Sequence, residues 1–231
     1  MAGTALEHSQ AASDVVQTKL SVRVIPFAVG SDGLSVALID SSTDADTVKL
    51  PAGQLREGES LTDCANRVAK DALAIPPDYV EQLYTFSVAG TVVKAIVAYL
   101  AILSADTRAH VLRRSNARFH HVDAIDGLGE VERGIIEYAK TRLRAKLGYS
   151  NIGFYFLPEE FTLTELQDVY ESVIGREQDK RNFRRRVLAA GIVEAVGSKR
   201  VTSHRPASLY RFAGGDPATD ALTPGDTDWS I

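Results

Sequence analysis

The chain begins with short apolar runs, separated by turn residues, that predict β-strands. The turn at 30–33 (Gly-Ser-Asp-Gly) divides the first two runs, and a shorter one at 89–91 (Ala-Gly-Thr) divides two later runs. Runs of this kind bounded by glycine turns are typical of paired strands in a sheet. The predicted strands are SVRVIPFAV (21–29), LSVALID (34–40), YVEQLYTFSV (79–88), VVKAIVAYLAILS (92–104) and RFHHVDAI (118–125), the last leading into a loop.

Two stretches in the same half repeat apolar residues every three or four positions and predict amphipathic helices. The first follows Ser60, which can cap a helix together with Asp63. Its apolar stripe is expected to lie on the sheet, with Cys64 as a small buried residue. The second is a long helix over residues 128–147. The stripes are Leu61, Cys64, Ala65, Val68, Ala72 and Ile75 in the first helix, and Leu128, Val131, Ile135, Ala139, Leu143 and Leu147 in the second.

Composition changes after residues 148–150, and two short helices and a pair of strands are predicted beyond them. Thr162 and Glu165 form the pattern of a capping box, which indicates the start of a helix. The next helix covers 179–191 and ends at a glycine, and residues 192–212 predict a β-hairpin. The residues expected to face inward are Leu163, Leu166, Val169, Tyr170, Val173 and Ile174 in the first helix, and Phe183, Val187 and Leu188 in the second.

These patterns predict two domains between two tails. The first domain covers residues 18–148 and ends in the helix at 128–147, and the second covers 151–212. Residues 1–17 are small and polar, and residues 213–231 are rich in Gly, Pro, Thr and Asp, so both are predicted to be disordered tails.

Charge is divided unevenly between the two predicted domains. Between Arg176 and Arg211 there are ten Lys and Arg against three Asp and Glu. That segment therefore carries about +7 and the rest of the chain about −11 of the net charge of −4. The split indicates a basic module attached to an acidic one.

Several features favour a cytoplasmic protein. Cys64 is the single cysteine, so no intrachain disulfide is possible, as expected in a reducing compartment. The first twenty residues contain no apolar block and predict no signal peptide. The longest uncharged apolar run, Ala95–Leu103, is far shorter than the roughly 20 residues of a membrane helix.

The basic helix of the second domain is a candidate DNA-binding element. A basic face can simply be solvated, but cations are unfavourable at the positive end of a helix, and a polyanion would offset that cost. The preceding helix and tight turn give a helix-turn-helix, and the hairpin after it has the position of a wing. Arg and Asn suit direct reading of base edges, whereas Lys180, Lys199, Arg200 and Arg205 resemble phosphate contacts.

The loop and helix after Leu50-Pro51-Ala52 carry a spaced motif. Gly53, five residues, Glu59, seven residues and Arg67 resemble the Nudix box, the loop–helix–loop of hydrolases that cleave nucleoside diphosphates. The metal-binding carboxylates of that family fall here at Val68, Asp71 and Ala72, which leaves one shortened carboxylate. Because two Mg²⁺ ions on a diphosphate need several anionic oxygens, the sequence predicts no metal site and no catalytic residue.

A Nudix-like domain followed by this winged helix resembles the NrtR family of Nudix-related transcriptional regulators, over about residues 20–212. The resemblance is carried by FLPEEFTLTELQDVYE, DKRNFRRRVLAAGIVE and RPASLYRF, and by EQLYTF near the ligand cleft. It implies an α+β fold: an N-terminal Nudix-like α/β/α sandwich with a mixed sheet, and a C-terminal winged helix-turn-helix. It further implies a dimeric repressor on a palindromic operator, with NAD biosynthesis genes or sugar genes as targets. ADP-ribose or an NAD-related nucleotide is then the effector, with no other cofactor.

The resemblance also assigns residues. Gly53, Arg56, Glu59 and Arg67 shape the ligand loop, with Tyr84 and Phe86 beside it. The predicted ligand-binding residues are Gly53, Arg56, Glu59, Arg67, Asp71, Tyr84 and Phe86. The predicted DNA-binding residues are Thr162, Thr164, Lys180, Arg181, Asn182, Arg184, Arg185, Lys199, Arg200 and Arg205.

Two other functions fit the same sequence. One is an active Nudix hydrolase of ADP-ribose-like substrates that carries a regulatory DNA-binding tail. The other makes the winged helix a protein-interaction module, which predicts a shallow dependence of binding on salt. The operator and the sign of the effector are not fixed by the sequence.

Overall fold

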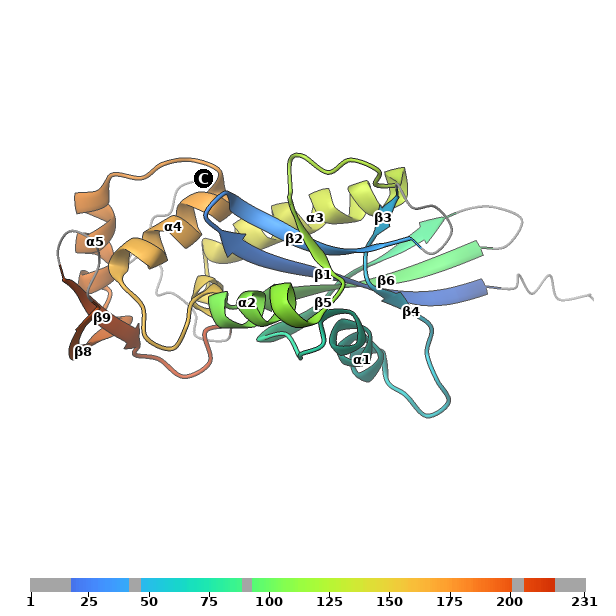
Figure 1. Ribbon diagram of the computed structural model, residues 1–231, viewed down its shortest axis with the longest axis horizontal. Helices are drawn as coiled ribbons and strands as arrows, with labels where there is room; N and C mark the ends of the chain where they lie inside the picture. Colours follow the sequence, from blue (N-terminus) through green and yellow to red (C-terminus); the bar gives the residue numbers. More distant parts are fainter. Residues whose placement is uncertain (1–17, 42–46, 89–92, 201–205, 219–231) are drawn as a thin grey trace, which may run out of the picture.

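The computed structural model describes residues 18–41, 47–88, 93–200 and 206–218. A mixed β-sheet lies between helices in one half of the molecule, and a small helical module with a hairpin forms the other end (Figure 1). The predicted turn at 89–91, residue Arg205, the predicted tail at 1–17 and residues 219–231 of the predicted tail at 213–231 lie outside these residues. Residues 213–218 of that tail are described, and Asp216 accepts a hydrogen bond from the hydroxyl of Tyr155.

The five predicted strands are present, although the last ends at His121 and not at Ile125, and two short strands are added to them. The path through the sheet is β3-β2-β1-β6-β5, with β4 paired to β1 and β7 paired to β2. β1 and β6 run parallel over a long register, while β1–β2 and β5–β6 are antiparallel. The strands are β1 (Thr18–Gly30), β2 (Gly33–Asp40), β3 (Val48–Lys49), β4 (Ala52–Gly53), β5 (Tyr79–Val88), β6 (Val93–Leu103) and β7 (Arg118–His121).

Alternation along the central strands gives the sheet two apolar faces. In β1, Ile25 and Phe27 face one side, while Val24 and Ala28 face the other. α1 (Leu61–Leu73) covers the second side, and α3 (Glu130–Leu147) covers the first. The helices lie on opposite sides of the sheet in Figure 1, so the expected α/β/α sandwich is present.

The N-terminal helices differ from the prediction in three details. Ser60 caps α1 through the backbone N–H of Asp63, as expected. α2 (Ala105–Arg114) was not predicted, and it packs beside α1 on the same face of the sheet. α3 begins two residues later than expected, and Val131 is exposed because it lies on the outer side of the first turn. Lys140, unexpectedly, is buried and paired with Asp123.

The C-terminal module has the predicted winged helix elements. Thr162 and Glu165 make the complete capping box at the start of α4. Phe183 and Val187 of α5 are buried, but the prediction for Leu188 was wrong, because this side chain lies half-exposed beyond the end of the buried stripe. The elements are η1 (Ile152–Phe156), α4 (Leu163–Ile174), α5 (Lys180–Ala189), β8 (Val193–Arg200) and β9 (Ala207–Phe212).

The two halves share one hydrophobic core. The cluster under α3 continues from Phe27 of β1 through Leu147 and Phe154 to Phe183 of α5 without a polar break. The composition change at residues 148–150 therefore marks a change of module within one continuous core. Within the described part of the chain, no helix is long and apolar enough to span a lipid bilayer.

Candidate nucleic-acid interface and effector cleft

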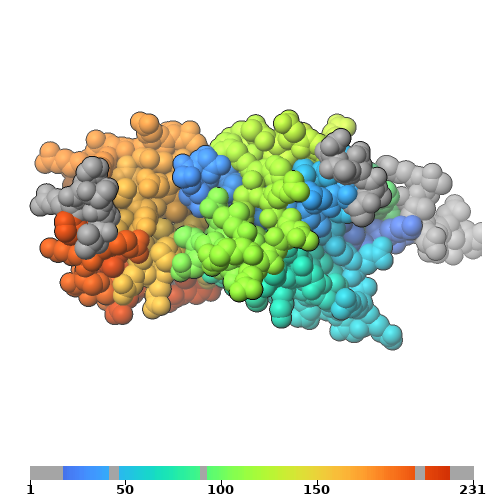
Figure 2. Space-filling view, in the orientation of Figure 1, coloured from blue at the N-terminus to red at the C-terminus, as the bar shows by residue number. Residues whose placement is uncertain are grey.

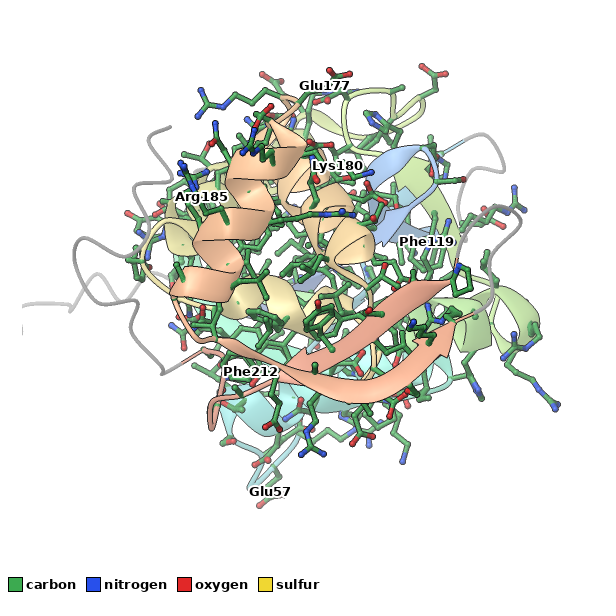
Figure 3. All side chains as sticks on the ribbon, turned by 90° about the vertical axis from the view of Figure 1, so that its left-hand side faces the viewer. Glu57, Phe119, Glu177, Lys180, Arg185 and Phe212 are labelled. Carbon is green, nitrogen blue, oxygen red and sulfur yellow. The ribbon has the colours of Figure 1, made fainter. Side chains whose placement is uncertain are left out.

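α5 presents a basic face at the far end of the molecule. Asp179 caps the helix by accepting a hydrogen bond from the backbone N–H of Asn182 at 2.8 Å. The first turn of α5 contains no acidic residue, and Lys180, Arg181 and Arg185 are exposed. Figure 3 looks onto this end, with α5 above the β8–β9 hairpin. The N-terminal end of α5, which carries the positive end of the helix dipole, and the cations beside it are therefore exposed on the same surface.

A groove of about 840 Å³ joins α5 to the start of α4 and to the hairpin. It brings together predicted DNA-binding residues from three separate stretches of sequence. Those lining it are Thr162, Thr164, Lys180, Arg184, Lys199 and Arg200. Arg181, Asn182 and Arg185 lie on the exposed face of the same helix, α5.

Two of these arginines have partners inside the protein. Arg184 donates to the hydroxyl of Thr164 at 3.0 Å. Arg200 donates to the Glu165 carboxylate at 2.5 Å and to the carbonyl oxygen of Glu160 at 2.9 Å. The expectation that Arg200 is simply a phosphate contact omitted this pairing, which fixes the hairpin to the capped end of α4.

In the other half, Glu59 and Arg67 brace the loop before α1. Arg67 donates to the two carboxylate oxygens of Glu59 at 2.7 and 2.8 Å, and to the carbonyl oxygen of Gln54 at 3.0 Å. The Glu59 carboxylate also accepts from the backbone N–H of Arg56 at 2.9 Å. The bond from Arg67, followed by that from Arg56, lowers the pKa of Glu59 to about 2. The bidentate pair holds the loop in one conformation.

The positions that carry metal-binding carboxylates in Nudix hydrolases do not fit Mg²⁺ here. Val68 is buried, and one of its methyl groups lies 2.5 Å from where a Cβ on Gly53 would be. Ala72 has no oxygen ligand to offer, and the Asp71 carboxylate lies 4.0 Å from the Arg67 guanidinium. One carboxylate beside an arginine cannot supply the several anionic oxygens that a pair of Mg²⁺ ions requires.

The resemblance implied that Tyr84 and Phe86 lie beside this loop, but the structure places both side chains elsewhere. Their rings pack against Tyr138 of α3, at 5.3 and 5.6 Å between ring centroids. α3 covers the face of the sheet opposite α1. Within one chain, the predicted ligand residues are therefore divided between the two faces.

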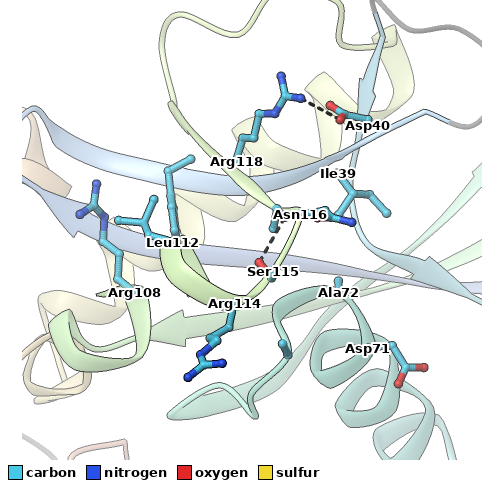
Figure 4. Close-up of a pocket in the computed structure, with 13 residues that line it drawn as sticks. Ile39, Asp40, Asp71, Ala72, Arg108, Leu112, Arg114, Ser115, Asn116 and Arg118 are labelled. Carbon is cyan, nitrogen blue, oxygen red and sulfur yellow. Dashed lines mark hydrogen bonds and ion pairs between the residues drawn. The ribbon is translucent and has the colours of Figure 1, made fainter. Parts of the chain in front are cut away.

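A large cleft lies between the C-terminal end of α1, β2 and the segment from α2 to β7. Its volume is about 1000 Å³, enough for a nucleotide. Asp71 is the one predicted ligand residue that lines it. Figure 4 shows Asp71 and Ala72 below the cleft and Arg118 above it, paired with Asp40 at 3.0 Å. The α2–β7 segment lies on the face of the molecule seen in Figure 2.

The cationic residues of this cleft were missed because α2 was not predicted. Arg108 lines the cleft and lies over the ring of Phe119 at 5.0 Å. Ser104 caps α2 through the backbone N–H of Thr107, and basic residues fill its last turn. Those two signals, a Ser cap and a basic C-terminal turn, could have identified the helix from the sequence.

The fold and the two sites define a class of protein: a Nudix-like domain joined to a DNA-binding winged helix. Comparison with known proteins agrees with this class. The family model of the NrtR DNA-binding winged helix domain matches residues 153–212. The ADPR responsive transcriptional repressor NtrR of Acinetobacter baylyi is 28% identical over 212 residues, covering 87% of this chain and 84% of its own.

Solved structures resemble most of the chain. NrtR of Shewanella oneidensis, crystallised with a 27mer DNA, matches with a TM-score of 0.78 at 29% identity, over 88% of this chain and 97% of its own. A MutT/nudix family protein from Enterococcus faecalis shares the fold, with a TM-score of 0.67 at 20% identity, over 89% and 90% of the two chains. The chain belongs to the NrtR family, as its sequence motifs had indicated.

Proposed function

We propose that this protein is a cytoplasmic transcriptional repressor whose Nudix-like domain senses ADP-ribose or a related nucleotide without hydrolysing it. The observation that carries the proposal is the groove of α4, α5 and the β8–β9 hairpin, in which cations of α5 and β8 lie beside the threonines at the start of α4. That arrangement suits a helix entering the major groove with a wing on the adjacent backbone. The repressor activity of the Acinetobacter baylyi relative supports the same function.

The winged helix is proposed to act on DNA as part of a homodimer. Arg181, Asn182 and Arg185 are exposed on α5, where they can reach base edges, while Lys180 and Lys199 flank them as phosphate contacts. Two recognition helices one helical turn of DNA apart then match a palindromic operator. Genes of NAD biosynthesis or salvage are the proposed targets.

The effector is proposed to occupy the cleft between α1 and the α2–β7 segment. Its volume of about 1000 Å³ suits a nucleotide, and Arg108, Arg114 and Arg118 offer cations for a diphosphate. Because Val68 and Ala72 supply no oxygen ligands, the bound nucleotide is retained rather than cleaved. The braced loop of Glu59 and Arg67 supports the helix that forms one wall.

A band shift against the DNA upstream of the gene and its neighbours, with and without ADP-ribose, tests the proposal. Specific retardation that ADP-ribose alters supports both halves of it. Retardation that is unchanged at saturating ADP-ribose removes ADP-ribose as effector and keeps the DNA function. No retardation at low salt contradicts the repressor. An assay of ADP-ribose cleavage with Mg²⁺ or Mn²⁺, run in parallel, separates this function from an active hydrolase.

A further inference from the structure

Two cations in the last turn of α3, Arg144 and Lys146, contact the two halves of the molecule. Arg144 donates to the carbonyl oxygen of Val173, near the end of α4, at 2.8 Å. Lys146 donates to the hydroxyl of Tyr79 at 2.9 Å and is paired with the carboxylate of Glu81, both on β5. Two residues along a helix turn the side chain by about 200°, so the cations point to nearly opposite sides.

The contact on the β5 side is a compact polar network around a mostly buried lysine. The Lys146 side chain is 13% exposed, and Tyr79 donates to Glu81 at 2.5 Å. Burial raises the pKa of Glu81, but the bonds from Lys146 and Tyr79 outweigh it, so the pKa lies below its usual value. The Tyr79 ring stacks on Tyr155 of η1 with centroids 4.8 Å apart. β5 is therefore tied to α3 and to the first element of the winged helix module.

A second chain of contacts joins the same part of β5 to α1 through the sheet. The hydroxyl groups of Thr62 on α1 and Tyr99 on β6 lie 3.4 Å apart, and Tyr99 also donates to the side chain of Gln82 at 3.3 Å. Gln82 is the neighbour of Glu81, and the register of β5 shifts between Gln82 and Tyr84. A bulge of this kind is a place where a strand can change its bend without losing its ladder on either side.

We propose that the last turn of α3 is the joint through which nucleotide binding changes the position of the winged helix, with Lys146 and Arg144 as its positioning residues. The inference rests on the proposed function, since it names the route of that regulation. A shift of α1 on nucleotide binding moves β5 through Tyr99, and Lys146 carries the shift to α3. Arg144 then passes it to α4.

The test compares operator affinity with and without saturating ADP-ribose, which gives a coupling factor for each variant. In Lys146→Met we expect operator affinity and ADP-ribose affinity each to stay within about threefold of wild type, while the coupling factor falls to near one. If Lys146 served only stability, its replacement would lower both affinities and leave the coupling factor unchanged. Because coupling is reciprocal, ADP-ribose affinity measured with and without operator must give the same factor.

Control variants keep the outcomes distinct. Lys94→Met removes an exposed cation from the far end of β6 and is expected to keep the full coupling factor. Glu81→Gln keeps the size of the side chain and is also expected to reduce the coupling factor. It replaces Lys146→Met as the test if that variant is poorly folded. A full coupling factor in a folded Lys146→Met or Glu81→Gln overturns the joint. Absence of any ADP-ribose effect in the wild-type protein instead overturns the proposed effector.

Discussion

The pair formed by Glu165 and Arg200 allows a direct test of what the wing does. One oxygen of Glu165 accepts from the backbone N–H of Thr162 at 2.7 Å, and the other accepts from Arg200. The second guanidinium nitrogen of Arg200 donates to the carbonyl oxygen of Glu160. Since these donors are used within the protein, we expect Arg200 to position the wing rather than to neutralise a phosphate.

The size of the effect follows from exposure. The side chains of Arg200 and Glu165 are 40% and 38% exposed, so their pair contributes about 0–1 kcal/mol to the free energy of unfolding. For a chain of this length, that is a fall in the unfolding midpoint of at most about 4 °C. A wing that has lost this contact can still be ordered when the operator binds, and the free energy required is the same, about 0–1 kcal/mol. Arg200→Met and Glu165→Gln should therefore each weaken operator binding by at most about fivefold for each protomer.

The assay is fluorescence anisotropy on operator DNA, at salt concentrations from about 50 to 200 mM. We expect both variants to keep the wild-type slope of log affinity against log salt, and the double variant to be no weaker than either single one. Lys199→Met, next to Arg200 and exposed, is the matched control and should reduce the slope by about 0.9 for each protomer. The reasoning is refuted if Arg200→Met lowers the slope by the same amount while Glu165→Gln strengthens binding.

Three further outcomes follow from the structure. Phe183 is fully buried, so Phe183→Ala should cost about 3–5 kcal/mol in urea unfolding, and a cost below about 1 kcal/mol would contradict its place in the core. The pKa of Glu59 is about 2 against an ordinary value of 4.5, so its ion pair with Arg67 stabilises the loop above pH 4.5 and is lost as the pH falls through 2. The protection factors of the loop amides, which correct for the pH dependence of intrinsic exchange, should thus be unchanged between pH 7 and 5 in the wild type and lower throughout in Glu59→Gln. Equal protection factors in the variant would argue against the brace. Ala72→Glu, beside the cleft, should gain no Mg²⁺-dependent ADP-ribose hydrolysis, because Asp71 would be the only other carboxylate at the three positions where Nudix hydrolases bind metal. Measurable turnover would show that the missing carboxylate at position 72 alone accounts for the lost activity.

Local signals in the sequence were enough for most elements. Apolar runs bounded by turn residues predicted the strands, and the caps at Ser60 and Thr162 were predicted from one residue and its neighbour three positions on. These features need no knowledge of distant contacts. α2 was missed because only Thr107 and Val111 of its residues are buried, so it has almost no apolar stripe to detect.

Exposure was harder to predict, because it depends on what each face meets. Val131 and Leu188 have the spacing of core residues, yet both are exposed in the described part of the chain. Lys140 has the opposite property: its ammonium group is buried because Asp123 and Glu137 converge on it, at 2.5 and 3.0 Å. Asp123 lies 17 positions away in sequence, so periodicity within the helix could not indicate this pair.

The division of the predicted ligand site has one physical cause. In an unbroken strand, Val80, Gln82, Tyr84 and Phe86 would share the face of the sheet that α1 covers. The register shift between Gln82 and Tyr84 adds one residue, and every side chain after it changes face. Tyr84 and Phe86 therefore meet α3, and a bulge of this kind leaves no mark in the sequence that alternation alone can detect.

The shared core restricts how a nucleotide can act on DNA binding. Domains joined by a flexible linker can reorient freely, but here Leu147, Phe154 and Phe183 belong to one packed cluster that also includes Phe27 of the sheet. Close-packed cores change between discrete arrangements and do not deform gradually. A signal from the cleft must therefore reach the winged helix through a contact that can be exchanged at low cost. Polar contacts at the end of α3 meet that requirement, whereas the apolar cluster beside them does not.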